Sequence, residues 1–198
     1  MMRRLLTALA ALPALSLPAA AHHPMGGAMP ETAMEGFLSG LGHPVIGPDH
    51  LAFLLAVGLL AGLAGWGFGR VASFVAASLA GVFIAWMGGV LPGAELLVAA
   101  SVIGVGVALL ARVELPALAW AGLLAIAGLA HGQAYAEAII GAEPTPVWAY
   151  LLGLAVVQAI LALGLAWIVA TRPALTARRV PQLAGIAVVL VGALALVG

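Results

Sequence analysis

Long apolar runs, separated by short polar or glycine- and proline-rich breaks, dominate the chain. Six such runs lie at 36–64, 71–91, 96–111, 115–140, 147–170 and 183–198. A helix needs about 20 apolar residues to cross the hydrocarbon core of a bilayer, and local thinning accommodates shorter ones. Because lipid offers the backbone no hydrogen-bond partner, helices are the expected spanning elements. We therefore predict an all-α polytopic membrane protein with six transmembrane helices in a domain at 36–198.

The first 21 residues are expected to be a cleaved secretory signal peptide, 1–21. Arg3 and Arg4 precede a short apolar stretch that ends in three consecutive alanines, 19–21, which suits a cleavage site. Residues 22–35 would then form a periplasmic N-terminal tail. An uncleaved membrane anchor is the alternative.

The positive charges predict an orientation. The arginines beyond the signal peptide all follow the first, third and fifth apolar runs: Arg70, Arg112, Arg172, Arg178 and Arg179. Arginine-bearing loops stay on the cytoplasmic side of a membrane. We therefore expect a bacterial cytoplasmic (inner) membrane protein whose mature N-terminus and C-terminus both lie outside, on the periplasmic side.

Composition narrows the classes of function. The chain is 65% hydrophobic and 7% charged with a net charge of zero, whereas soluble domains carry about 25% charged residues. Nothing in this balance suggests a nucleic-acid partner. The absence of cysteine excludes disulfides and thiolate metal sites. No nucleotide-binding motif is present, and no prosthetic group is expected.

Glycines at four-residue spacing predict close helix packing. The pairs are Gly36/Gly40, Gly58/Gly62 and Gly65/Gly69. Small residues at this spacing let helices approach closely in lipid.

The first apolar run contains a polar cluster with a broken backbone, GHPVIGPDH at 42–50. Its ligand-type residues are His43, Asp49 and His50, and its helix breakers are Pro44, Gly47 and Pro48. On an unbroken helix, His43 and His50 would be separated by about 10 Å along the axis. Proline and glycine disfavour a continuous helix here. We expect the break to bring His43 back toward Asp49 and His50.

A second polar cluster, AHGQAYAEAII at 130–140, falls at the same depth in the fourth run. His131 lies about 24 Å along the helix from its start, and Glu137 follows it. Tyr135 shares a helix face with His131, and Gln133 is a further polar neighbour. Ionisable groups inside a bilayer cost roughly 2.5–3.5 kcal/mol each, so five at one level indicate a functional site.

Imidazole and carboxylate ligands suit Ni²⁺, Co²⁺ or Zn²⁺. The predicted metal ligands are His43, Asp49, His50, His131 and Glu137. Tyr135 and Gln133 are expected to contact these ligands rather than the ion. His22 and His23, at the mature N-terminus, form a separate candidate for metal capture. In the alternative reading, Asp49 caps a helix, the histidines make buried hydrogen bonds, and Gln133 joins helices. The membrane serines Ser39, Ser73, Ser78 and Ser101 show no motif linking them to the histidines.

These motifs resemble the HupE/UreJ family of nickel permeases. HPVIGPDH matches the family's H-x5-D-H motif in its first membrane helix, and HGQAYAEAI resembles its second motif. Many members have histidine where this chain has Tyr135, and their glutamate falls one residue later than Glu137. The resemblance implies uptake of Ni²⁺ or Co²⁺ as the transported ion, in support of hydrogenase or urease maturation.

The resulting hypothesis is an inward transporter of a divalent metal ion rather than an enzyme. Two alternatives remain open on the sequence alone. One is an intramembrane metal-dependent hydrolase that activates water on a bound ion. The other is a metal sensor or assembly partner that binds metal without transporting it.

Overall fold

The structure, a computed structural model, describes residues 28–197, and the regular secondary structure in that range is entirely helical. Its helices in chain order are α2 (Ala33–Ile46), α3 (Pro48–Leu63), α4 (Phe68–Trp86), α5 (Ala94–Ala111), α6 (Ala117–Tyr135), η3 (Ala136–Ala138), α7 (Pro144–Thr171), η4 (Pro173–Thr176) and α8 (Arg179–Ala195). The all-α prediction is confirmed for these residues. The predicted signal peptide and His22 and His23 lie outside the described residues.

Four helices are long and apolar enough to cross a membrane: α4, α5, α6 continued by η3, and α7. Helices α2 and α3 meet the same criterion together and would form a fifth span, bent by 79°. Helix α8 has 17 residues and is shorter than the others. The chain is therefore an integral membrane protein with four or five candidate spans, and the sixth stays a prediction.

The first predicted span is broken at Gly47. Helix α2 begins with a capping box, in which the Glu35 N–H donates to Thr32 Oγ1 and the Thr32 N–H donates to Glu35 Oε2. Pro44 lies inside α2 and does not end it. The chain leaves the helix at Gly47 (φ −76°, ψ 110°), and Pro48 opens α3, where its missing N–H has no cost. The bend therefore rests on Gly47 and Pro48.

Glycines set the close approaches between helices. A Cβ on Gly40 would strike the Tyr150 carbonyl oxygen of α7, and one on Gly62 would lie 2.7 Å from the Ala166 carbonyl oxygen. The first two predicted glycine pairs therefore do mediate packing. The third does not, because a Cβ on Gly69 would meet nothing within 4 Å. Its partner Gly65 supplies the left-handed turn (φ 62°) that follows α3.

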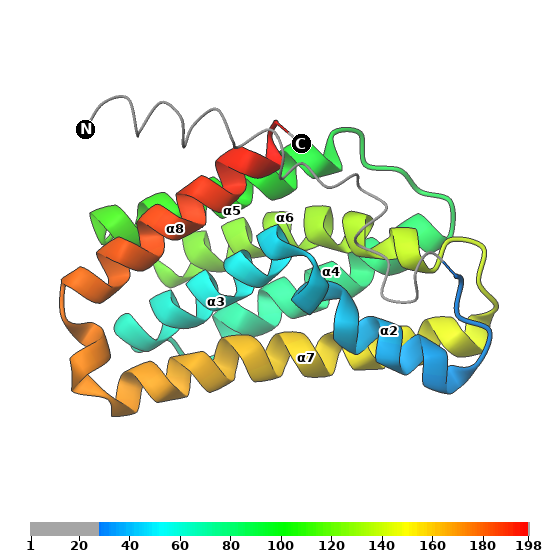
Figure 1. Cartoon of the computed structure of the whole chain (residues 1–198), viewed down its shortest axis with the longest axis horizontal. Coiled ribbons are helices and arrows are strands. Elements are labelled where there is room, and N and C mark those ends of the chain that lie inside the picture. The colour runs from blue at the N-terminus through cyan, green and yellow to red at the C-terminus, as the bar shows by residue number, and fades with distance from the viewer. Residues whose placement is uncertain (1–27, 198) are drawn as a thin grey trace, which may run out of the picture.

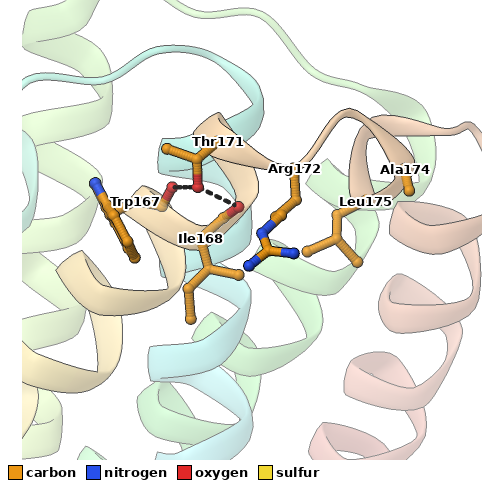
Figure 2. A pocket seen from close by; sticks show the side chains of 6 residues that line it. All are labelled: Trp167, Ile168, Thr171, Arg172, Ala174 and Leu175. Atoms are coloured by element: carbon orange, nitrogen blue, oxygen red, sulfur yellow. Dashed lines mark hydrogen bonds between the residues drawn. The ribbon is translucent and has the colours of Figure 1, made fainter.

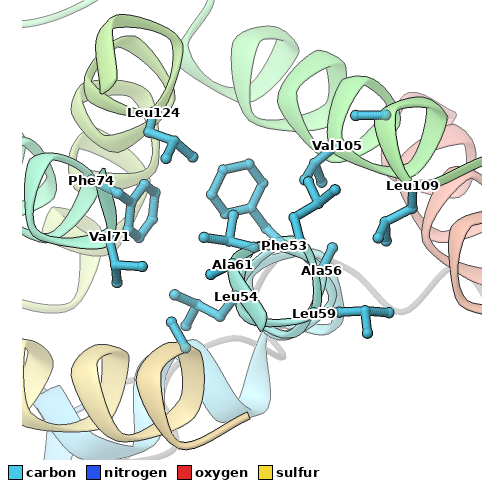
Figure 3. Packing of buried hydrophobic residues seen from close by; sticks show 14 of the residues in the cluster. Phe53, Leu54, Ala56, Leu59, Ala61, Val71, Phe74, Val105, Leu109 and Leu124 are labelled. Carbon is cyan, nitrogen blue, oxygen red and sulfur yellow. The ribbon is translucent and has the colours of Figure 1, made fainter. Parts of the chain in front are cut away.

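Helix α3 occupies the centre of the bundle. Figure 3 views it end-on, with Phe53 and Leu54 surrounded by apolar side chains of α4, α5 and α6. Helix α2 packs on α7, α4 on α6, and α5 on α8 (Figure 1). The connections α3–α4, α5–α6 and α7–α8 all lie at one end of the bundle, and the arginines lie in these connections or in the first turn of the helix that follows. We call this the arginine end. The other end, which carries Glu95, Glu137 and Glu143, is called the acidic end.

The glycine contacts predict unequal effects of two alanine substitutions in α6. A Cβ on Gly128 would lie 2.5 Å from the Phe74 carbonyl oxygen of α4, whereas one on Gly122 would meet nothing within 4 Å. We expect Gly128→Ala to destabilise the protein by about 1–3 kcal/mol through overpacking. Gly122→Ala should be neutral or stabilising by up to about 1 kcal/mol, because alanine favours helix. Thermal unfolding in detergent would measure both, and equal midpoints would contradict the packing.

Candidate metal site

Three buried histidines from distant parts of the sequence meet near the break in the first span. His43 lies in the last turn of α2, His50 in the first turn of α3 and His131 in α6, and their exposed fractions are 3%, 6% and 0%. The ring centroids of His43 and His50 are 6.0 Å apart, and those of His50 and His131 are 4.9 Å apart. The two histidines of the first motif therefore lie as ring neighbours on either side of the bend at Gly47.

His131 links His50 to α5 through hydrogen bonds at both ring nitrogens. Its Nδ1 lies 2.8 Å from His50 Nδ1, and its Nε2 lies 2.9 Å from Ser101 Oγ. Ser101 Oγ–H donates to the Val98 carbonyl at 2.7 Å. No sequence motif links the membrane serines to the histidines, yet the structure brings Ser101 against His131. Because its one proton goes to Val98, Ser101 is not arranged as a nucleophile that hands its proton to histidine.

His43 has a separate hydrogen-bond partner on α7. Tyr150 Oη lies 2.9 Å from His43 Nδ1 and donates its proton to the Tyr135 carbonyl at 2.7 Å. That carbonyl is available because the helix tightens after Tyr135, where the Ile139 N–H bonds to the Ala136 carbonyl instead. The end of α6 thus supplies the acceptor that fixes Tyr150.

Tyr135 packs against both histidines of the first motif. Its ring centroid lies 5.3 Å from that of His43 and 4.4 Å from that of His50. The residue is fully buried, and its hydroxyl has no hydrogen-bond partner among the described residues. Buried hydroxyls are almost always paired, with protein, water or a ligand. This hydroxyl therefore marks a position at which a polar ligand or water is expected beside the imidazoles.

The two predicted carboxylate ligands occupy different surroundings. Asp49 is half-buried in the first turn of α3, and its Oδ1 accepts from the neighbouring His50 N–H at 2.8 Å, but the N-cap of this helix is Gly47 rather than Asp49. Glu137 lies on η3 with its side chain exposed, because α6 ends at Tyr135 and the chain continues as a tighter helix. Among the described residues, no three His, Asp or Glu side chains are grouped to hold a metal ion. The five-ligand set stays a prediction.

Gln133 joins helices at the acidic end. Its Oε1 accepts from the Leu91 N–H at 3.0 Å, and its Nε2 donates to the Gly81 carbonyl at 3.1 Å. Both partners belong to α4 or to the connection that follows it. These contacts are those expected in the alternative in which Gln133 joins helices.

The histidine cluster is closed by aromatic side chains on the side of the apolar core. The His131 ring lies 4.5 Å from that of Phe53 and 5.5 Å from that of Phe74 (centroid distances), and Figure 3 shows these two phenylalanines side by side. Apolar surroundings strengthen the hydrogen bonds of the cluster, because water cannot compete for them.

Two site residues carried no clear signal in the sequence. Ser101 stands alone in an apolar run, and helical serines commonly bond to the carbonyl one turn back, as this one does. Tyr150 is one of only two tyrosines in the chain, and a hydroxyl inside a span usually has a partner. The expectation that a tyrosine hydroxyl inside a span has a partner was therefore the available signal for Tyr150.

A pocket lies elsewhere, at the arginine end. Figure 2 shows it at the junction of α7 and η4, lined by Trp167, Ile168, Thr171, Arg172, Ala174 and Leu175. Thr171 Oγ1 bonds to the carbonyls of Trp167 and Ile168 there. None of the three histidines contributes to it, so the pocket is not the predicted site.

The fold and the cluster define the class: an integral membrane protein of apolar helices with buried histidines at a broken span. The family described as "HupE / UreJ protein" matches residues 9–195, so the chain belongs to the HupE/UreJ family. Protein HupE of Rhizobium leguminosarum bv. viciae is 32% identical over 193 residues, which cover 94% of this chain and 95% of that protein. No solved structure matches the chain. Membership suggests a nickel or cobalt permease role. The family is linked to metal-ion transport for hydrogenase and urease maturation, and it is a transporter or accessory family rather than a catalytic one.

Gly47 and Gly67 offer a matched pair for testing the break. Both precede a helix in an extended conformation, but a Cβ on Gly47 would lie 2.7 Å from His50 Cδ2, while one on Gly67 would meet nothing within 4 Å. Gly47→Ala should displace the His50 ring and destabilise the protein by about 1–3 kcal/mol more than Gly67→Ala. The cost of alanine at a helix N-cap is common to both and cancels. Thermal unfolding would measure the difference, and no difference would contradict the contact.

Proposed function

We propose that the protein carries Ni²⁺, or alternatively Co²⁺, inward across the bacterial cytoplasmic membrane. One observation carries the proposal: three buried imidazoles meet where a membrane helix is broken, inside a bundle whose buried side chains are mostly apolar. Imidazole nitrogens suit Ni²⁺ and Co²⁺, with Zn²⁺ as a competitor. Family membership points to the same ions. The ion is the cargo, delivered to the maturation of a metalloenzyme.

The position of the cluster suits capture from outside. His131 lies in the last part of α6, toward the acidic end of the bundle. Asp49 adds a half-buried carboxylate next to His50, which would offset part of the charge of a divalent ion. Glu137 is exposed at the acidic end, where it would attract cations on their way to the histidines rather than bind beside them. If His22 and His23 bind metal, they act before this site.

The broken first span supports transport rather than storage. Irregular backbone at membrane depth is tolerated where it lines a polar pathway or is buried in protein. Transporters use such breaks to form ion sites near the middle of the membrane. Here the break separates α2, which packs on α7, from α3 at the centre of the bundle.

Uptake of ⁶³Ni²⁺ and ⁵⁷Co²⁺ into proteoliposomes tests the function. We expect saturable uptake by the natural protein and a loss of at least about tenfold in His50→Ala, since even the partners of metal ligands matter by that factor. Ser73→Ala is the control, because Ser73 bonds to the Arg70 and Ala121 carbonyls, away from the histidines. Gel filtration would verify that each variant is folded. Metal binding without uptake by the natural protein would contradict the transport proposal and favour a role as a metal sensor.

The proposed orientation is testable because the chain has no cysteine. Single cysteines at Thr176, exposed on η4, and at Glu143, exposed before α7, sit at opposite ends of the bundle. A membrane-impermeant thiol reagent should label Glu143→Cys in spheroplasts and Thr176→Cys only after the membrane is opened. The reverse pattern would invert the topology and make the acidic end cytoplasmic.

A further inference from the structure

The hydroxyl bonds around the cluster determine where the histidine protons lie. Ser101 Oγ–H donates to the Val98 carbonyl, so the hydroxyl can meet His131 Nε2 only as an acceptor. His131 therefore carries its proton on Nε2. A fully buried imidazole in an apolar bundle is held neutral, because a charge there is costly. Its Nδ1 is then a lone pair.

The same assignment of donors and acceptors extends to His50. Its Nδ1 lies 2.8 Å from His131 Nδ1, and one of these two atoms must donate. Because His131 Nδ1 has no proton, His50 Nδ1–H is the donor. The lone pair of neutral His50 is consequently on Nε2.

A second, independent chain of bonds gives His43 the same form. Tyr150 Oη–H donates to the Tyr135 carbonyl, so it accepts from His43 Nδ1–H. The lone pair of His43 is therefore also on Nε2. Metal-binding histidines commonly show this arrangement, in which one ring nitrogen holds the ion while the other N–H is donated to a fixed partner.

The distance between the two rings fits a shared ion. With metal–nitrogen bonds of about 2 Å, two imidazoles on one ion have centroids about 4.5 Å apart at a right angle and about 6 Å apart on nearly opposite sides of the ion. The centroids of His43 and His50 are 6.0 Å apart. The buried Tyr135 hydroxyl, which lacks a partner among the described residues, belongs to a ring that packs against both. It would bond to water or another ligand carried by the ion.

We propose that His43 and His50 bind the ion through Nε2, while His131 is an orienting partner and not a ligand. Ser101 and Tyr150 are positioning residues that fix the protons of the three rings. This division of roles rests on the proposed function for the identity of the ion, but the proton positions do not. The three histidines are then not equivalent: two of them are ligands, and each ligand is held by its own series of hydrogen bonds.

Nitrogen-15 NMR of histidine-labelled protein without metal, in detergent, tests the proton positions. The full-length protein should show His131 protonated at Nε2, and His43 and His50 protonated at Nδ1. Ser101→Ala should leave His131 in a mixture of both forms, and Ser101→Thr, which keeps the hydroxyl, should restore the single form. Ser73→Ala, the matched membrane serine, should change nothing. His131 protonated at Nδ1 in the natural protein would overturn the proposal.

Equilibrium dialysis with ⁶³Ni²⁺ tests the roles. His43→Ala and His50→Ala should abolish saturable binding, whereas Ser101→Ala and His131→Gln should weaken it by about 10–100-fold, the usual effect of removing a ligand's partner. Complete loss in His131→Gln, equal to that in His50→Ala, would make His131 a ligand and overturn the division.

The two proposals fail separately. If the natural protein takes up nickel but Ser101→Ala binds it as tightly as Ser73→Ala does, the positioning roles are wrong and transport stands. If the natural protein binds nickel with the expected proton positions but shows no uptake, transport is wrong and the positioning roles stand.

Discussion

The backbone turns through 79° at Gly47 while surrounded by apolar helices, and the arrangement of the histidines depends on that turn. Gly47 has no side chain, which leaves room for the His50 ring beside the backbone. Pro48 opens the next helix without an N–H to satisfy. Asp49 accepts the His50 N–H, so a donor exposed by the break is paired within the same short segment. The break is therefore stabilised locally.

Around this turn, protein carbonyls and hydroxyls set the state of the imidazoles. Val98 and Tyr135 each provide a backbone oxygen, and a hydroxyl relays its effect to a histidine. One of these oxygens comes from an ordinary helical turn and the other from the point where α6 tightens. Burial makes the relays effective, because water cannot replace either partner. The chemistry of the site thus reaches back to the way helices α5 and α6 are formed.

Much of the fold was readable from the sequence. Each α-helix from α2 to α8 overlaps one of the six apolar runs, with α2 and α3 sharing the first, since a membrane helix must be predominantly apolar. The meeting of His43, His50 and His131 followed from their depth in two runs and from the glycine and proline between the first two. These predictions rest on periodicity and length, which are local properties.

The finer contacts were not readable, because they depend on how helices rotate and pair. Ser101 reaches His131 only because α5 and α6 pack with those faces together, and no local pattern fixes such a rotation. Pro44 was expected to help break the helix, yet it sits inside α2, one turn before the bend. Glu137 stays a predicted ligand; its side chain is exposed on η3, the tighter helix that follows α6, which its spacing from His131 does not reveal.

Helix lengths in the bundle differ in a way that bears on how it sits in lipid. Helix α7 has 28 residues, about 42 Å, while α8 has 17, about 26 Å. A hydrocarbon core of about 30 Å is shorter than α7, so α7 must tilt or project, whereas α8 is shorter than that core. A projecting α7 would place Trp167 and Arg172 at the level of the lipid headgroups, where indole and guanidinium side chains are favoured. The thickness of the host membrane would then bias the tilt of α7, and with it the Tyr150 hydroxyl that holds His43.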